Sequence, residues 1–281
     1  METCSCLRVG RANPEHARAL LANPMRNHLL IGNADKTDRI LQLATDHFLL
    51  IDDGPIIEAF LQAFPHARLF DITQHSFNPL RGIGYLQARD FATALYTASP
   101  EGKDTLTVRN GKRALLRLLL DRPTRLDALQ ASTDDPGELE AVAMLDDILL
   151  SPVLKNVLCK PTNFSFKGVV LAKLDRATIG DFDAFLLATL LVGHFKGHII
   201  IPDFGFYGRD FYMSFIRQNR LVAGLNFLSE LPPKLSQAVL SIKDKTVYRT
   251  TREDAERLVF YLGISNPSVI TDLAEGETLT V

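Results

Sequence analysis

Short aliphatic and β-branched runs alternate with longer stretches of helical periodicity along most of the chain, and this alternation constrains the fold more than any other feature. Each run is long enough for one buried strand, and each intervening stretch can carry the chain back across a sheet. Strands joined in this way run parallel and are covered by helices. The sequence therefore predicts an α/β fold with a mostly parallel sheet flanked by helices. The expected strands are His28 to Ile31, Phe48 to Asp52, Ala67 to Asp71, Gly168 to Leu174, His198 to Ile201, Val222 to Leu228 and Thr246 to Arg249.

Proline near a first turn marks the start of two helices. Asp53-Gly54-Pro55 precedes an apolar periodicity that predicts a helix near 56 to 64, and Asp135-Pro136 precedes one near 137 to 150. The most apolar stretch, Phe185 to Val192, has the length of a buried helical segment rather than of a membrane span. We therefore expect it in the core.

One long segment departs from the alternation. From Tyr85 to Cys159 the pattern is helical with polar joins, which predicts a helical insertion at 85–160 packed on the sheet. Residues 1–24 are expected to form an N-terminal arm, because chain termini become ordered only when they are tied down. Residues 25–281 are expected to form the α/β domain itself.

Composition narrows the class of protein. The 281 residues are 46% hydrophobic, enough for a large core, and the formal net charge of −2 argues against an extended basic surface. The average charge does not exclude a local basic patch in a ring or groove. Three cysteines are too few for a disulfide framework, and no apolar run approaches the roughly 20 residues that span a bilayer. These features predict a cytoplasmic protein without a transmembrane segment.

The run Leu29 to Thr37 combines an apolar strand, a glycine turn and Lys-Thr before a helix. A phosphate-binding loop has this order, with Lys-Ser/Thr directly after a second glycine. Here Gly32 lies two residues too close to Lys36, and Asp35 replaces the second glycine. A carboxylate at that position repels phosphate, and a shortened turn offers fewer N–H donors. An ordinary strand–turn–helix fits the same residues, and that alternative stays open at this point.

A second candidate is the apolar strand that ends at Pro202-Asp203. A buried strand ending in an acid is how a Walker B motif presents a carboxylate to magnesium, and a glutamate usually follows to polarise the attacking water. Phe204 stands where that glutamate is expected. A strand that simply ends at a Pro-Asp turn explains the pattern equally well.

Two arginines, Arg217 and Arg220, lie between a helical pattern and the strand predicted at Val222. A guanidinium group pairs well with phosphate, so either arginine is a candidate finger on the nucleotide of a neighbouring subunit. The alternative to a finger role is that these arginines only interact favourably with the dipole at the end of a helix.

The order of these features resembles the motor domain of the HerA/FtsK/TraG group of DNA-translocating P-loop ATPases, which includes the conjugative coupling proteins. The likeness runs from about Met25 to the C-terminus and includes the turn Ile51-Asp52-Asp53-Gly54, the motif Phe77-Asn78-Pro79-Leu80 and the helical run Asp254 to Leu258. The resemblance implies a RecA-like P-loop NTPase fold that binds ATP and Mg²⁺ and forms rings.

The resemblance also implies roles for six residues. Gly32, Lys36 and Thr37 correspond to the nucleotide-binding residues, Thr37 and Asp203 to the metal ligands, and Asp203, Arg217 and Arg220 to the catalytic group. The chain departs from the family at the second loop glycine, at the Walker B glutamate and at the Thr-Gln sensor, where it has Ser229-Glu230-Leu231.

These departures predict a non-hydrolysing subunit or adaptor, a pseudo-ATPase, in a DNA-transfer, secretion or packaging assembly. As partners we expect further copies of the chain or a related active ATPase in a mixed ring, and DNA is left open. One alternative is an active, divergent ATPase that uses Lys36, Thr37 and Asp203 with an acid from Asp52, Asp53 or Glu230. Another is a nucleic-acid-binding structural protein without nucleotide.

Overall fold

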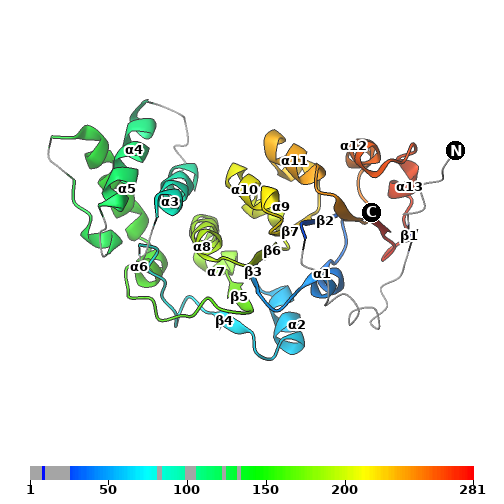
Figure 1. Cartoon of the computed structure of the whole chain (residues 1–281), viewed down its shortest axis with the longest axis horizontal. Coiled ribbons are helices and arrows are strands. Elements are labelled where there is room, and N and C mark those ends of the chain that lie inside the picture. Colours follow the sequence, from blue (N-terminus) through cyan, green and yellow to red (C-terminus); the bar gives the residue numbers. More distant parts are fainter. Residues whose placement is uncertain (1–7, 10–25, 81–83, 99–105, 122–124, 132–133) are drawn as a thin grey trace. The chain divides into compact units, whose positions relative to one another are not determined.

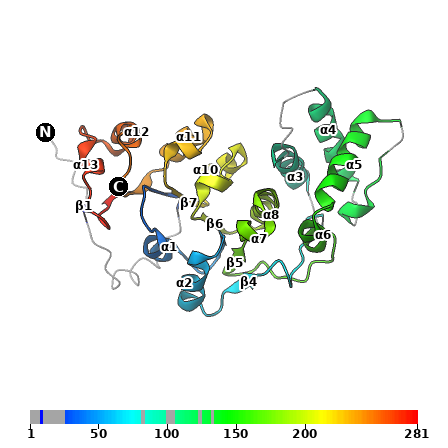
Figure 2. The ribbon, with the colours of Figure 1, turned by 180° about the vertical axis from the view of Figure 1, so that it is seen from behind.

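The computed structural model describes residues 8–9, 26–80, 84–98, 106–121, 125–131 and 134–281. These residues form two compact units, the first from the described residues up to Ala67 together with Gly197–Val281, and the second from those of Arg68–Lys196. Figure 1 labels most of the helices and strands of both units, and Figure 2 shows them from behind.

The first unit is built on a mixed, mostly parallel sheet with the order β1-β9-β8-β2-β7-β6-β3. Strands β8, β2, β7, β6 and β3 run parallel to their neighbours, whereas β9 pairs antiparallel with both β8 and β1. Its strands are β1 (Arg8–Val9), β2 (His28–Ile31), β3 (Phe48–Asp52), β6 (His198–Ile201), β7 (Leu221–Leu225), β8 (Asp244–Val247) and β9 (Leu279–Thr280).

Helices follow most of these strands and carry the chain to the next one. They are α1 (Thr37–Leu43), α2 (Pro55–Ala63), α9 (Phe204–Tyr207), α10 (Met213–Arg217), α11 (Pro233–Leu240), α12 (Arg252–Leu262) and α13 (Ser268–Thr271), with 3-10 turns η4 (Asp210–Tyr212) and η5 (Leu228–Glu230). The strands β2, β3 and β7 are buried along their whole length. This explains why they read as continuous apolar runs, since a parallel sheet is covered on both faces.

The second unit pairs two parallel strands, β4 (Arg68–Phe70) and β5 (Val170–Lys173), and is otherwise helical. Its helices are α3 (Tyr85–Ala98), α4 (Leu106–Leu120), α5 (Pro136–Leu149), α6 (Pro152–Leu158), α7 (Arg176–Ile179) and α8 (Asp181–His194), with the 3-10 turn η3 (Leu126–Ala128). Helices α3, α4 and α5 lie side by side in both views (Figures 1 and 2).

The predicted fold class is confirmed: a mostly parallel sheet is flanked by helices. The expected buried helix lies inside α8, where every residue from Asp183 to Val192 is buried. The segment expected to be helical contains α3 to α6. The domain boundaries drawn from the sequence stay predictions, as does the arm at 1–24, of which the structure describes only Arg8–Val9.

Two predicted strands are misplaced in the structure. The strand expected at Val222 to Leu228 ends at Leu225, because the N–H of Leu228 leaves the sheet and donates to the carboxylate of Asp254. The strand expected at Thr246 to Arg249 begins two residues earlier. The polar Lys245 belongs to it because its N–H and carbonyl both pair with Val281.

His28 at the start of β2 should make the fold sensitive to acid. Its Nε2 lies 2.9 Å from the Thr246 hydroxyl, and burial, then Arg39, then Lys245, lower its pKa from 6.5 to about 3. Unfolding restores the higher pKa, so the unfolded chain binds more protons between pH 3 and 6.5 and stability is lost as the pH falls through that range. We expect protonation of His28 in the unfolded chain to lower the free energy of unfolding by about 2 kcal/mol between pH 7 and pH 5.

Urea unfolding at pH 7 and pH 5 measures this cost. A His28→Gln variant should lose about 2 kcal/mol less than the wild type on acidification. The matched control is the same substitution at the exposed His66. Equal losses in His28→Gln and the wild type would show that His28 accepts a proton without unfolding.

Candidate functional site

The candidate site lies at the carboxyl edge of β2, β7 and β6, all in the first unit. Parallel pairing places Ile31 of β2 opposite Leu225 of β7, so the residues that follow these strands meet at one edge. Strand β6 pairs with the other side of β7 and adds Asp203 to the same edge. In parallel α/β sheets this edge is where ligands bind.

Gly32 turns the chain away from the sheet at the end of β2. Its φ is +123°, and a side chain there would place Cβ 2.7 Å from the carbonyl oxygen of Tyr248 and 2.8 Å from that of Arg249. Its N–H donates to the carbonyl of Leu225 at 3.1 Å. The glycine is therefore required by close packing against the neighbouring strands.

The N–H groups that follow are also engaged within the chain. That of Asn33 donates to the Arg249 carbonyl, and that of Ala34 to the Gly32 carbonyl, both at 3.1 Å. A phosphate-binding loop needs such donors to point into a common hollow. In this chain they instead hold the turn against the segment that follows β8 and close the turn on itself.

The carboxylate of Asp35 lies at the amino end of α1. Its Oδ1 accepts from the N–H of Thr37 at 2.9 Å and from the Thr37 hydroxyl at 2.6 Å. These two hydrogen bonds from Thr37 lower the pKa of Asp35, so it is ionised at neutral pH. The first N–H of the helix and the hydroxyl expected to hold magnesium are thus both bound to a carboxylate of the chain itself.

Lys36 is only 7% exposed, and its ammonium group is held by two oxygen atoms. Nζ donates to the Ala34 carbonyl and to Oδ1 of Asn226, each at 3.1 Å. Nζ also lies 6.0 Å from the ring centroid of Tyr248. The lysine therefore bridges the loop to the end of β7.

Three carboxylates of the first unit act electrostatically on this ammonium group. Burial lowers the pKa of Lys36, while Glu230, Asp35 and Asp203 oppose the shift, in that order of strength. These carboxylates offset part of the cost of burying the Lys36 charge, and a triphosphate would compete with them for it.

Glu230 links η5 to both neighbouring strand ends. Its Oε2 accepts from the Asn226 N–H at 3.2 Å. A Cβ on Gly205 would lie 2.2 Å from the same oxygen, so the carboxylate packs directly on the backbone of α9. Any larger residue at 205 would displace it.

Asp203 follows β6, as the sequence predicts, and caps α9. Its carboxylate accepts from the Phe206 N–H at 3.4 Å and makes further interactions. Asp52, a candidate for an alternative acid, is buried and caps α2 by accepting from the N–H groups of Gly54 and Ile56. Burial raises the pKa of Asp52.

The two candidate arginines lie at the other edge of the sheet. Arg220 directly precedes β7, and its Nε and Nη2 donate to the Gly197 carbonyl at 2.9 and 2.6 Å. Its guanidinium also lies 5.3 Å from the ring centroid of Phe215. Arg217 is exposed at the end of α10. Neither joins Lys36, so a finger role would require a second subunit and stays a prediction.

The structure thus brings Gly32, Lys36, Thr37 and Asp203 together at one edge and separates Arg217 and Arg220 from them. Asn226 is the partner that the sequence did not predict. Its position directly after a strand was visible, but its pairing with Lys36 depends on the strand order β2-β7.

ATP with magnesium does not fit the site in this arrangement. Asp35 holds the amino end of α1, the loop N–H groups named above donate to carbonyls, and Lys36 is buried among oxygen atoms. Among the described residues no group of three or more His, Cys, Asp or Glu side chains is arranged to hold a metal ion. Within the same part of the chain no helix is both long and apolar enough to cross a membrane.

The chain has a RecA-like α/β fold. The chain is similar to the plasmid coupling protein TrwB, solved with the non-hydrolysable ATP analogue ADPNP, with a TM-score of 0.58 and 12% identity over 98% of this chain and 91% of that one. It is also similar to VirB4 of Thermoanaerobacter pseudethanolicus, with a TM-score of 0.61 and 10% identity over 91% and 86% of the two chains. No protein-family model and no curated protein matches the sequence.

Proposed function

We propose that this chain is a P-loop domain of the HerA/TraG type that no longer hydrolyses ATP and serves as a structural subunit or adaptor of a DNA-transfer, secretion or packaging assembly in the cytoplasm. The likeness in fold to TrwB, a plasmid coupling protein, and to VirB4 supports the type of assembly. The observation that carries the loss of hydrolysis is the pairing of Asp35 with Thr37 at the amino end of α1.

The physical argument is that the chain supplies its own anion and its own counter-charges. In a working loop the helix N-terminus, the backbone N–H groups and the lysine all converge on phosphate oxygens. Here Asp35 replaces the phosphate at the helix, and Asn226 with the Ala34 carbonyl holds the lysine. Phe204 follows Asp203, so the residue that positions the attacking water is also absent from its usual place.

As partners we propose further copies of this chain, or a related active ATPase with which it shares a ring. In such a ring the exposed Arg217 is the group available to a neighbour, while Arg220 is engaged with Gly197.

A steady-state assay of ATP hydrolysis tests this function, with and without DNA. The wild type should release phosphate no faster than an Asp203→Asn variant, because a site without bound triphosphate has no reaction to lose. A rate in the range of about 1 per second that falls at least about 100-fold in Asp203→Asn would overturn the proposal.

One observation favours an active ATPase as the second candidate. Glu230 is the strongest of the three carboxylates acting on Lys36 and lies against the α9 backbone next to Phe204, so it is placed near the missing Walker B glutamate. In that case Glu230→Gln should abolish turnover while leaving nucleotide binding intact. In the non-hydrolysing domain the same variant has no turnover to lose.

A further inference from the structure

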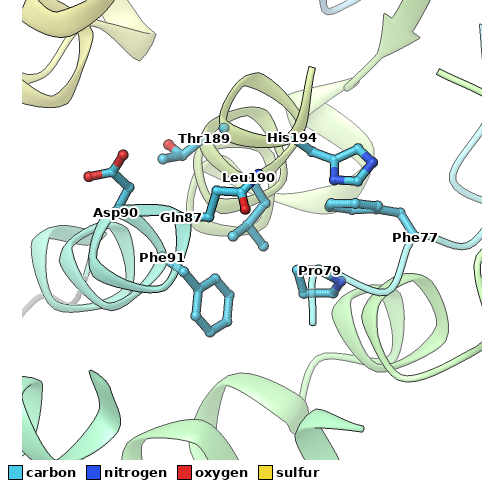
Figure 3. A pocket seen from close by; sticks show the side chains of 9 residues that line it. Phe77, Pro79, Gln87, Asp90, Phe91, Thr189, Leu190 and His194 are labelled. Atoms are coloured by element: carbon cyan, nitrogen blue, oxygen red, sulfur yellow. The ribbon is translucent and has the colours of Figure 1, made fainter. Parts of the chain in front are cut away.

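A small pocket in the second unit lies between the segment after β4, helix α3 and helix α8 (Figure 3). The space measures about 30 Å³, which is room for only one or two water molecules. Figure 3 shows the Asp90 carboxylate and the His194 ring on opposite sides of it, with Gln87 between them. The pocket therefore suits water, and a partner of this unit would have to bind its outer surface.

Helix α4 exposes a face that combines leucine with arginine. Leu106, Arg113 and Leu120 follow one another at intervals of seven residues, a spacing that places them along one side of a helix. Leu106 is 73% exposed and Leu120 37%. Arg109 and Arg117 flank this row and are exposed as well. We call these five residues the basic face of α4.

Helix α5 exposes a face that combines leucine with aspartate. Leu139, Ala143, Asp146 and Leu150 lie along one side of the helix, and Asp147 adjoins them. Leu139 is 49% exposed and Leu150 79%, and the other three residues are exposed too. We call these five residues the acidic face of α5.

The two faces do not cover one another within one chain. Helices α4 and α5 pack together through other residues, since a Cβ on Gly137 of α5 would lie 3.4 Å from the Cβ of Ala114 of α4. Gly111 and Ala114 belong to the buried side of α4, and Gly137 belongs to that of α5. Each face is on the opposite side of its helix, and both face solvent.

Most charges of the two faces are also left without an opposite charge. Arg117 pairs with Asp135 at 2.8 Å. Arg113, by contrast, takes part in no side-chain hydrogen bond or ion pair with any residue that the structure describes. The same holds, over the same residues, for the carboxylates of Asp146 and Asp147. The basic face can therefore gain by meeting an acidic one.

We infer that copies of this chain associate through these helices, with the basic face of α4 in one copy packed on the acidic face of α5 in another. Each face carries exposed leucines that lose contact with water in such a pair, and the small Ala143 allows close approach. Faces of like charge repel, so the basic face selects the acidic one. The inference rests on the proposed assembly of copies of this chain and is independent of the nucleotide site.

Sedimentation equilibrium of the full chain measures this association. We expect a Kd on the order of 10 µM at low salt, because a pair of helix faces is smaller than a standard protein interface. Raising the salt from about 0.05 M to about 0.5 M should weaken association at least about threefold, since exposed charges are screened.

Charge reversal tests which faces meet. Arg113→Glu alone and Asp146→Arg alone should each weaken association at least about tenfold, because each creates a pair of like charges. An equimolar mixture of the two variants should associate as tightly as the wild type, since each reversed residue then meets an opposite charge. Two exposed residues of the first unit supply controls, and Lys234→Glu and Phe260→Ser should change nothing.

Three results would overturn the inference. A chain that stays monomeric at all concentrations would remove self-association and leave a mixed ring with a related ATPase as the proposed assembly. Association that survives both Arg113→Glu and Asp146→Arg would keep copies of the chain as partners but place their contact elsewhere. A mixture that associates no better than the separate variants would show that Arg113 and Asp146 do not meet across the interface.

Discussion

Replacement of Lys36 by methionine is expected to lower the free energy of unfolding by about 3 kcal/mol. Methionine fills similar space but leaves the Ala34 carbonyl and the Asn226 amide without their donor. It also leaves Glu230, Asp35 and Asp203 without the cation that lies among them. The main loss is that of two hydrogen bonds from a buried charged donor, since Lys36 is buried whereas the carboxylates stay in contact with solvent.

Urea unfolding followed by circular dichroism measures this loss. Lys234→Met is the matched control, because Lys234 is exposed on α11 and should change stability by less than about 0.5 kcal/mol. If Lys36 served only to bind a nucleotide, its replacement would not change the stability of the nucleotide-free protein. A Lys36→Met variant as stable as the wild type would therefore count against the structural role assigned here.

The second large effect is expected at Gly224, in the middle of the sheet. A Cβ at this position would lie 2.2 Å from the carbonyl oxygen of Pro202, a backbone atom at the end of β6. An alanine can be accommodated only if β6 and β7 move apart, so we expect Gly224→Ala to cost about 3 kcal/mol. The same movement would separate Asp203 from Asn226.

Gly84→Ala provides the control for this substitution. The nearest atom to a Cβ at Gly84 is the side-chain oxygen of Gln87 at 3.7 Å, an ordinary contact. Thermal unfolding should show Gly84→Ala within a few degrees of the wild type and Gly224→Ala lower by at least about 5 °C. Similar unfolding temperatures for the two variants would mean that the sheet edge adapts to the added methyl group.

Much of the fold could be predicted from the sequence because buried parallel strands leave continuous apolar runs. The strands His28–Ile31, Phe48–Asp52 and His198–Ile201 begin and end where the pattern predicts. The short strands β1 and β9 could not be found in this way. Two residues cannot show an alternation, and their pairing depends on partners far along the chain.

The sequence predicted which residues belong to the candidate site, but not how their side chains contact one another. The mismatch at Asp35 could be read directly, since a carboxylate replaces a glycine of the loop. The sequence could not show that this carboxylate caps α1, or that Asn226 and Glu230 approach Lys36 from β7 and η5. The hydrogen bond between Lys36 and Asn226 joins residues 190 positions apart and follows from the strand order.

The most direct measurement of the central claim is equilibrium binding of a fluorescent ATP analogue to the wild-type chain with magnesium, with unlabelled ATP as competitor. Because Asp35 holds the end of α1 and Lys36 is held by Ala34 and Asn226, we expect no displaceable binding tighter than about 100 µM. Displaceable binding with a micromolar Kd would show that the loop opens to admit a triphosphate, and it would contradict the claim that the chain fills its own phosphate site.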